Sequence, residues 1–280
     1  MKTKRDYFFH ALLVLAIITV TTVYLFFIGS IVFNGLPGAD FNFLIEAPLQ
    51  AGRSGGINSV LTSTLMILLV CLLTVVPIGL GAGYYLVEFS DTHQRAGSFI
   101  RWSLNILASS PSIVFGLFGN IFFCVYLKFG FSILSGGLTL ACMCLPFFIY
   151  SVEHGLRSVS PDIKKSARAL DLSKTTTLFK ILLPASKSYI TTGLLICIAR
   201  AVSETAALIF TSGSVDRMPD SFLDSGRSLS VHIYELSMNV TGGDQNAYRS
   251  AFVLLILVLV INSIATSLAK SKFKVLGAQT

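Results

Sequence analysis

The sequence predicts an all-α membrane protein with six transmembrane helices, and three observations support this fold class. Of the 280 residues, 53% are hydrophobic and only 12% are charged, whereas charged residues make up about 25% of an ordinary soluble domain. The apolar residues lie in runs of about 20 residues or more, which is the length that a helix needs to cross a bilayer. The basic residues are concentrated in alternate connecting segments. Lipid is therefore the predicted solvent for most of the chain.

Five charge-free runs and a sixth that carries Arg200 and Glu204 predict six spans in a single membrane domain covering residues 1–280. The first run begins after a basic amino terminus, but it is far longer than the apolar core of a cleavable signal peptide, which is about 7–15 residues. We therefore interpret it as an uncleaved first helix. The predicted spans are 8–33, 59–87, 103–127, 130–151, 189–211 and 250–269.

The lysines and arginines predict the orientation of these spans. With the amino terminus inside, fifteen of them fall on the cytoplasmic side, five fall outside and Arg200 lies in the membrane, which accounts for all 21. This distribution follows the positive-inside rule and predicts a multi-pass inner (plasma) membrane protein with both termini cytoplasmic. It also explains the net charge of +7. No nucleic-acid partner is expected, because the basic residues are not gathered with aromatic residues on one face.

Glycine and proline mark the connections and the interruptions. The outer loop 34–57 is rich in both and predicts turns rather than a folded domain. In the second span, Gly79 and Gly83 form a small-xxx-small spacing that permits close helix packing in lipid. The Ser-Ser-Pro sequence that ends at Pro111 predicts a kink or a re-entrant bend in the third span, where the serines can satisfy freed backbone groups. The second large outer loop contains one ordered stretch, Leu229–Met238.

The long cytoplasmic loop, 153–187, predicts two short helices with a bend between them. The Ser160–Asp162 segment has a capping serine, a proline at the first helical position and an acidic residue in the first turn. A helix is expected from there to about Leu170. Ser173 is a second capping residue, and apolar residues recur after it at helical spacing as far as Pro184.

No motif for catalysis, metal binding or nucleotide binding is present in the sequence. The phosphate-binding loop pattern Gly-x-x-x-x-Gly-Lys-Ser/Thr is absent, so ATP and magnesium are expected on partner subunits rather than in this chain. The sequence predicts no catalytic residue and no cofactor. All five cysteines lie in predicted spans, and Cys142-x-Cys144 lacks the second ligand pair of a metal site.

The most informative site is the pair Arg200 and Glu204 in the fifth span. Their i, i+4 spacing on a helix predicts an ion pair, and an intramembrane arginine is expected to face the bundle interior or a wet cavity. The guanidinium offers a planar fork of donors that suits tetrahedral oxyanions. We therefore predict a substrate path formed by Arg200, Ser203, Glu204 and Thr205, with Glu204 as the counter-charge of the empty site. The alternative is an ion pair that only joins helices.

The sequence resembles the PstA-type permeases of bacterial phosphate-specific ABC importers, and the resemblance covers nearly the whole chain. The motifs that carry it occur in the order and spacing of that family. They are Pro77-Ile-Gly-Leu-Gly-Ala-Gly-Tyr-Tyr-Leu-Val-Glu88, Pro111-Ser-Ile-Val-Phe-Gly-Leu-Phe-Gly119, Leu182-Leu-Pro184, Ala199-Arg200 with Glu204-Thr205-Ala206, and Leu229-Ser-Val-His-Ile-Tyr234.

The resemblance implies the fold of type I ABC importer permeases, also called MetI-like, and a set of partners. These are a second permease of the PstC type, two ATP-binding subunits of the PstB type and an extracytoplasmic phosphate-binding protein of the PstS type. It also implies that the cytoplasmic loop couples to the ATPase. The implied coupling residues are Lys165, Ala167, Ala169, Leu170, Asp171 and Leu172. Lys165 and Asp171 depart from the family pattern, which has Glu and Gly there, and Asp tolerates the left-handed backbone that a bend requires.

The expected function is therefore that of a non-catalytic permease subunit that imports inorganic phosphate, with ATP hydrolysed by partner chains. Another oxyanion such as sulfate or molybdate is the alternative substrate. An intramembrane enzyme would need two polar catalytic groups on different spans, and the sequence offers only the pair on one helix. A receptor would bind its ligand without a partner ATPase.

Overall fold

The structure is a computed structural model that describes residues 4–88 and 95–270. Three basic residues near the ends that contributed to the predicted orientation, Lys2, Lys272 and Lys274, lie outside the described residues. The described part is almost entirely helical. Its elements in chain order are α1 (Lys4–Gly35), α2 (Phe41–Ile45), β1 (Pro48–Leu49), η1 (Gln50–Gly52), β2 (Ser54–Gly55), α3 (Asn58–Glu88), α4 (Arg95–Ser109), α5 (Ser112–Gly119), η2 (Asn120–Tyr126), α6 (Ile133–Ser158), α7 (Pro161–Ala169), α8 (Lys174–Thr177), η3 (Leu178–Leu182), α9 (Leu183–Ala185), α10 (Lys187–Ser203), α11 (Ala206–Ile209), α12 (Leu229–Met238) and α13 (Asp244–Lys270).

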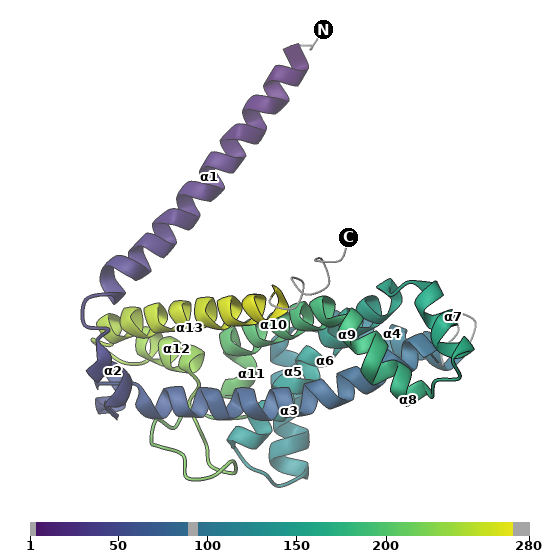
Figure 1. Cartoon of the computed structure of the whole chain (residues 1–280). Helices are drawn as coiled ribbons and strands as arrows, with labels where there is room; N and C mark the ends of the chain where they lie inside the picture. The colour runs from purple at the N-terminus through teal and green to yellow at the C-terminus, as the bar shows by residue number, and fades with distance from the viewer. Residues whose placement is uncertain (1–3, 89–94, 271–280) are drawn as a thin grey trace.

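Four helices in the described chain, α1, α3, α6 and α13, are long and apolar enough to cross a membrane. Two further apolar segments consist of bent pairs of helices. The segment from α4 to η2 bends by 103°, and the segment from α8 to α10 bends by 73°. Figure 1 shows α3, α6, α10 and α13 running in similar directions while α5 crosses them. The fourth and sixth predicted spans, 130–151 and 250–269, are parts of longer helices, α6 and α13.

The predicted kink at Pro111 is confirmed, and its cause is local. Proline has no N–H group and disfavours a helical conformation at the residue before it. The N–H of Ser110 bonds to Leu107 instead of Ile106, so the Ile106 carbonyl loses its helical partner. The hydroxyls of Ser109 and Ser110 both donate to that carbonyl, at 3.0 and 2.9 Å. The third predicted span, 103–127, is therefore two helices that meet at this bend, and the first of them begins at Arg95.

The core of the bundle lies between α3, α6 and α10. Gly79 of α3 faces the buried ring of Phe148, and a Cβ atom added at Gly79 would lie 2.3 Å from that ring. One turn further on, a Cβ atom at Gly83 would lie 2.5 Å from Val152. Side chains at these two positions would push the helices apart. The structure confirms that the small-xxx-small spacing permits close contact.

The outer loop 34–57 is more ordered than predicted. It contains α2 and a short antiparallel hairpin in which Pro48 pairs with Gly55. Phe43 and Ile57 from this loop pack with Val60 and Leu229 in a small separate core. The ordered stretch predicted at Leu229–Met238 is confirmed as α12. Ser228 caps the start of this helix, because its side chain accepts a hydrogen bond from the N–H of Val231 at 3.2 Å.

The long loop 153–187 forms the two predicted helical segments at the end of the bundle opposite to α2 and α12 (Figure 1). The Ser160 hydroxyl accepts the N–H of Asp162 at 3.3 Å before α7. The Ser173 hydroxyl accepts the N–H of Thr176 at 3.1 Å before α8. Asp171, between them, has a φ of 50°, the left-handed conformation that allows the bend.

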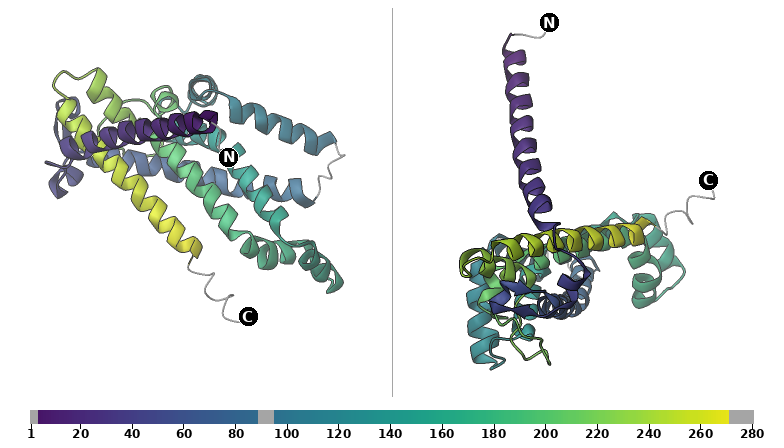
Figure 2. Two further views of the ribbon diagram at one scale, coloured as in Figure 1. Left: turned by 90° about the horizontal axis from the view of Figure 1, so that it is seen from above. Right: turned by 90° about the vertical axis from the view of Figure 1, so that its left-hand side faces the viewer.

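The helix α1 extends away from the rest of the molecule, as Figures 1 and 2 show. Its last residue, Gly35, packs closely against the Tyr248 carbonyl and Phe252 of α13. The large apolar side chains between Phe9 and Phe27 are all more than half exposed. Lipid or another membrane protein must cover this surface, because a soluble protein does not expose apolar area on this scale.

Candidate functional site

Arg200 lies on α10 where that helix packs against α6. The two helices are joined by reciprocal contacts in which the thiols of Cys144 and Cys197 each donate to the other's carbonyl at 3.6 Å. The guanidinium carbon of Arg200 lies 4.7 Å from the centre of the Phe147 ring. Its Nε atom is buried and has no hydrogen-bond partner. The charged group therefore lies against an aromatic ring of the neighbouring helix, and Arg200 is only partly exposed.

The predicted ion pair between Arg200 and Glu204 is not formed, which corrects the sequence interpretation. The helix ends at Ser203, and Glu204 has an extended backbone with φ −75° and ψ 128°. The i, i+4 geometry requires a continuous helix, so the two side chains do not meet. Glu204 Oε1 instead accepts the N–H of Ala207 at 3.2 Å. Its carboxylate thereby caps the start of α11.

The interruption at Glu204 also corrects the fifth predicted span, 189–211, which is not one helix. The Glu204 carbonyl, freed by the break, accepts the hydroxyl of Ser230 from α12 at 2.5 Å. The carbonyl of Phe210, at the end of α11, accepts the side-chain amide of Asn120 at 2.8 Å. Non-helical backbone at membrane depth is tolerated where protein groups satisfy it in this way. The break therefore lies beside Arg200 and is stabilised by contacts with α12 and η2.

The other two predicted path residues flank the break. The hydroxyl of Ser203 donates to the carbonyls of Ala199 and Arg200 at 2.8 and 3.2 Å. Ser203 itself is exposed. Thr205 is half-buried and precedes α11. The structure thus places Arg200 and Ser203 on one turn of α10 and brings Phe147 to Arg200, a contact for which the sequence offers no signal.

The predicted coupling residues form the tip between α7 and α8. Ala167 is 2% exposed, whereas Leu170 is 73% exposed. Lys165 makes a 3.8 Å ion pair with Asp162 in which both side chains are exposed. Ala169 ends α7, and Leu172 follows the bend at Asp171. A cavity of about 460 Å³ opens between this tip and the end of α3, lined by Tyr84, Glu88, Lys164, Asp171, Leu172, Lys174, Thr177 and Leu182.

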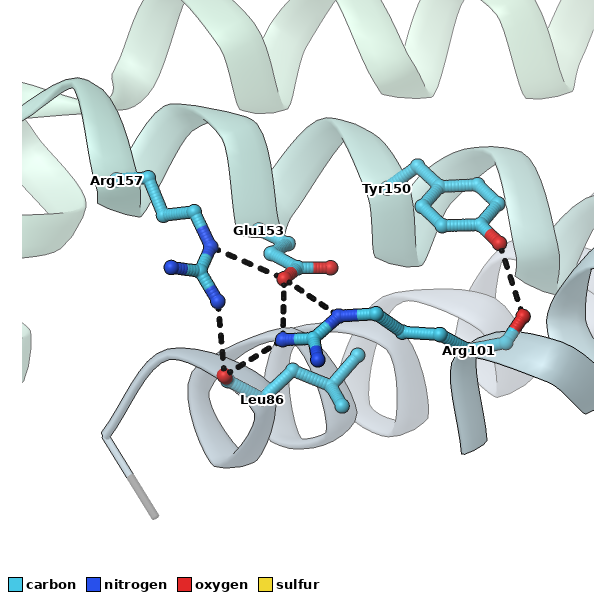
Figure 3. A network of polar contacts seen from close by, with 5 residues as sticks. All are labelled: Leu86, Arg101, Tyr150, Glu153 and Arg157. Atoms are coloured by element: carbon cyan, nitrogen blue, oxygen red, sulfur yellow. Dashed lines mark hydrogen bonds and ion pairs between the residues drawn. The ribbon is translucent and has the colours of Figure 1, made fainter. Parts of the chain in front are cut away.

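A buried carboxylate joins three helix ends near this tip (Figure 3). Glu153 of α6, 7% exposed, accepts hydrogen bonds at Oε1 from Arg101 Nη2 at 2.9 Å and from Arg157 Nε at 3.0 Å. Both arginines also reach the Leu86 carbonyl of α3 at 3.4 Å. The Tyr150 hydroxyl donates to the Arg101 carbonyl at 3.2 Å, which fixes α4 against α6. Sequence reasoning did not identify this network, because Arg101 is 52 residues from Glu153, although Glu153 and Arg157 are an i, i+4 pair on one helix.

A second polar cluster joins α12 to the loop 34–57. Arg227, 8% exposed, donates from Nε to the Ser214 carbonyl at 2.7 Å and lies 3.7 Å from the Asp216 carboxylate. Its Nη1 is 3.4 Å from Nδ1 of the fully buried His232. Burial, together with the Arg227 charge, lowers the pKa of His232 to about 3. The His232 ring also lies against Gly52, so the cluster ties the outer loop 34–57 to α12.

Comparison with known proteins places this geometry among membrane transport proteins. Residues 75–271 match the family described as "Binding-protein-dependent transport system inner membrane component". The chain is 30% identical to the probable ABC transporter permease protein YqgI of Bacillus subtilis (strain 168), with 94% of each chain covered. It is 29% identical to the phosphate transport system permease protein PstA of Xylella fastidiosa (strain Temecula1 / ATCC 700964), over 83% of this chain and 81% of that protein. A crystal structure of a bacterial ABC transporter that imports alginate has a chain with a TM-score of 0.68 at 15% identity, covering 96% of this chain and 97% of that one. The likeness confirms the predicted permease fold.

Proposed function

Because this chain belongs to the family of binding-protein-dependent transport system inner membrane components, we propose that it is the permease subunit of an ATP-driven importer of inorganic phosphate. It is a multi-pass inner membrane protein and a transporter subunit rather than an enzyme. The substrate assignment is supported by its similarity to phosphate transport permeases. The observation in this chain that carries it is the inward-facing Arg200 beside a broken helix.

Arg200 supplies the anion-binding group of the path. A guanidinium keeps its charge at all physiological pH values, and its planar fork matches two oxygens of a tetrahedral anion. Desolvation inside the bundle strengthens this interaction relative to water. The interruption at Glu204 lies next to the fork, and broken helices at the substrate site are a recurrent feature of membrane transporters. Phosphate would meet Arg200 as it passes and leave when the bundle opens to the other side.

Members of this family act with ATP-binding subunits and a substrate-binding protein. In the present proposal these are two ATP-binding subunits of the PstB type, a phosphate-binding protein of the PstS type, and a second permease of the PstC type. ATP and magnesium bind to the ATP-binding subunits. The exposed apolar tip at Leu170 is suited to docking on the ATPase, since it projects from a bend whose flanking helices both have capping serines.

The proposed orientation has both termini in the cytoplasm. The tip between α7 and α8 then lies on the cytoplasmic side, and α2 and α12 lie outside. The distribution of basic residues in the sequence supports this orientation. Reagent labelling from outside at a cysteine introduced for Leu170, in a cysteine-free background, would contradict it.

The decisive experiment measures radiolabelled phosphate uptake by the complete transporter in proteoliposomes, with subunit abundance measured in parallel. Arg200→Lys keeps the charge but loses the fork, so uptake should fall about tenfold or more, which corresponds to the loss of one hydrogen bond to a charged group. Arg200→Gln should abolish uptake at normal abundance. Full uptake by Arg200→Gln would refute the proposed site.

Two further measurements separate the alternatives. Excess unlabelled phosphate should compete for uptake, whereas sulfate and molybdate should not, and the reverse result would assign another oxyanion. Glu204→Gln retains an acceptor for the Ala207 N–H, so uptake should remain within about threefold of the natural protein if Glu204 is a cap. A complete loss of uptake at normal abundance would restore Glu204 as a counter-charge.

A further inference from the structure

Arg200 has no carboxylate partner among the described residues. The ion pairs that the structure describes join other residues, and the nearest acid in sequence, Glu204, caps α11 instead. The site therefore carries a positive charge that no anionic group in the described part of the chain neutralises. The group in contact with that charge is the ring of Phe147.

The way in which Phe147 contacts Arg200 determines which donors stay available. A cation within about 6 Å of an aromatic ring centre is attracted by the negative face of the ring, and the Arg200 carbon lies at 4.7 Å. A phenyl ring has no oxygen or nitrogen acceptor, so this contact does not occupy the five N–H donors of the guanidinium as a carboxylate would. Of its three nitrogens, Nε is the one that is buried without a partner. The two terminal nitrogens are not enclosed in this way, so the end of the fork remains open to a ligand.

We propose that Phe147 is the positioning residue of the anion site, and that the face of its ring holds the Arg200 guanidinium so that the terminal N–H donors remain free for phosphate oxygens. This inference rests on the proposed role of Arg200 in phosphate transport. A carboxylate counter-charge would act differently, because it would occupy the same donors and every arriving anion would have to displace it. An aromatic ring stabilises the charge without competing for those donors. Phe147 thus replaces Glu204 as the group that supports Arg200 in the empty site.

The test compares variants at position 147 that differ in aromaticity but little in volume. Equilibrium dialysis of radiolabelled inorganic phosphate against the purified complete transporter, without the binding protein, measures affinity at the membrane site. Phe147→Met retains an apolar side chain of similar size but has no ring, so phosphate should bind about two- to thirtyfold more weakly. This range corresponds to about 0.5–2 kcal/mol at about 1.36 kcal/mol per tenfold change. Phe147→Trp retains an aromatic face and should bind within about threefold of the natural protein.

A charged variant and a neighbouring control distinguish positioning from packing. Phe147→Glu places a carboxylate beside the fork, so it should bind phosphate more weakly than Phe147→Met does. Phe148→Met changes the adjacent ring, which is fully buried against Gly79 and Gly193. It should lower the abundance of the complex but leave phosphate affinity unchanged. Equal weakening by Phe147→Met and Phe148→Met would indicate a general packing effect and overturn the proposal.

The outcomes also separate this proposal from the proposed function. If Arg200→Gln loses phosphate binding while Phe147→Met and Phe147→Glu bind normally, Arg200 acts without Phe147 and the present inference alone is wrong. If Arg200→Gln binds phosphate normally, the anion site itself is wrong. Should Phe147→Met fail to assemble, Phe147→Trp still decides the matter. An assembled Phe147→Trp transporter that bound phosphate more than tenfold more weakly would contradict the role of the aromatic face.

Discussion

The Glu153 carboxylate, which joins α3, α4 and α6, offers a quantitative test of how this end of the bundle is held together. We expect Glu153→Gln to weaken the assembled subunit, because the amide has nearly the same shape but no charge. The Glu153 side chain is 9% exposed, while those of Arg101 and Arg157 are 25% and 46% exposed. The substitution therefore affects two interactions that differ in their exposure to solvent.

The magnitude follows from that difference. A hydrogen bond to a charged group contributes about 1.5–3 kcal/mol and a neutral one about 0.5–1.5 kcal/mol, so the bond with Arg101 should lose about 1–1.5 kcal/mol. The half-exposed Arg157 is screened by solvent and should lose less than about 1 kcal/mol. The total is about 2 kcal/mol. The two arginines, left without a carboxylate between them, also repel each other, which makes this figure a lower estimate.

The assay is the temperature at which the detergent-solubilised complex loses its monodisperse peak after heating. Domains of about 150–250 residues change their unfolding temperature by roughly 2–4 °C per kcal/mol, so Glu153→Gln should lower it by roughly 4–8 °C. Arg101→Gln should lower it by a smaller amount, and Arg157→Gln by the least. The reasoning would be refuted if Arg157→Gln, the most exposed member, were as damaging as Glu153→Gln.

Three further predictions concern other parts of the molecule. Leu170→Asp should leave the abundance of the subunit unchanged but strongly reduce uptake, because a charge would replace the exposed apolar tip; normal uptake at normal abundance would argue against coupling there. His232 is neutral in the fold, with its pKa lowered to about 3. Its contribution to the free energy of unfolding is therefore fully present above the pKa of the unfolded chain, about 6.5, and should fall by about 1.4 kcal/mol per pH unit below that pH. His232→Gln should abolish this pH dependence in thermal unfolding measured from pH 7 to 5. Gly79→Ala should destabilise the complex by about 1–3 kcal/mol through overpacking against Phe148. The control is Gly81→Ala, because a Cβ atom added there has nothing within 4 Å. It should be neutral or stabilising in the same heating assay.

The features that the sequence predicted well depend on neighbours along the chain. The kink at Pro111 and the caps at Ser160 and Ser173 each arise from a residue type acting on backbone groups within four positions. The ordered stretch expected at Leu229–Met238 is α12.

The features that the sequence did not predict depend on partners that are distant in the chain. The helix break after Ser203 is stabilised by Ser230, 26 residues further on, so local spacing predicted a continuous helix and an ion pair. The carboxylate of Glu153 is 52 residues from Arg101. Phe147 and Arg200 meet only because α6 and α10 pack together. Spacing rules cannot identify such pairs, because they assume a regular element that tertiary contacts can interrupt.

The separation of α1 from the bundle bears on how the protein is made. During synthesis α1 is made before α3 to α13, and its packing against this chain is concentrated near Gly35, where it meets α13. A single helix is stable in lipid because its backbone hydrogen bonds are internal, so α1 can wait in the bilayer until the rest of the chain follows. Its side chains impose few constraints on the folding of α3 to α12. An unrelated apolar helix of equal length, ending in the same Gly35, should therefore support the insertion of a correctly folded bundle.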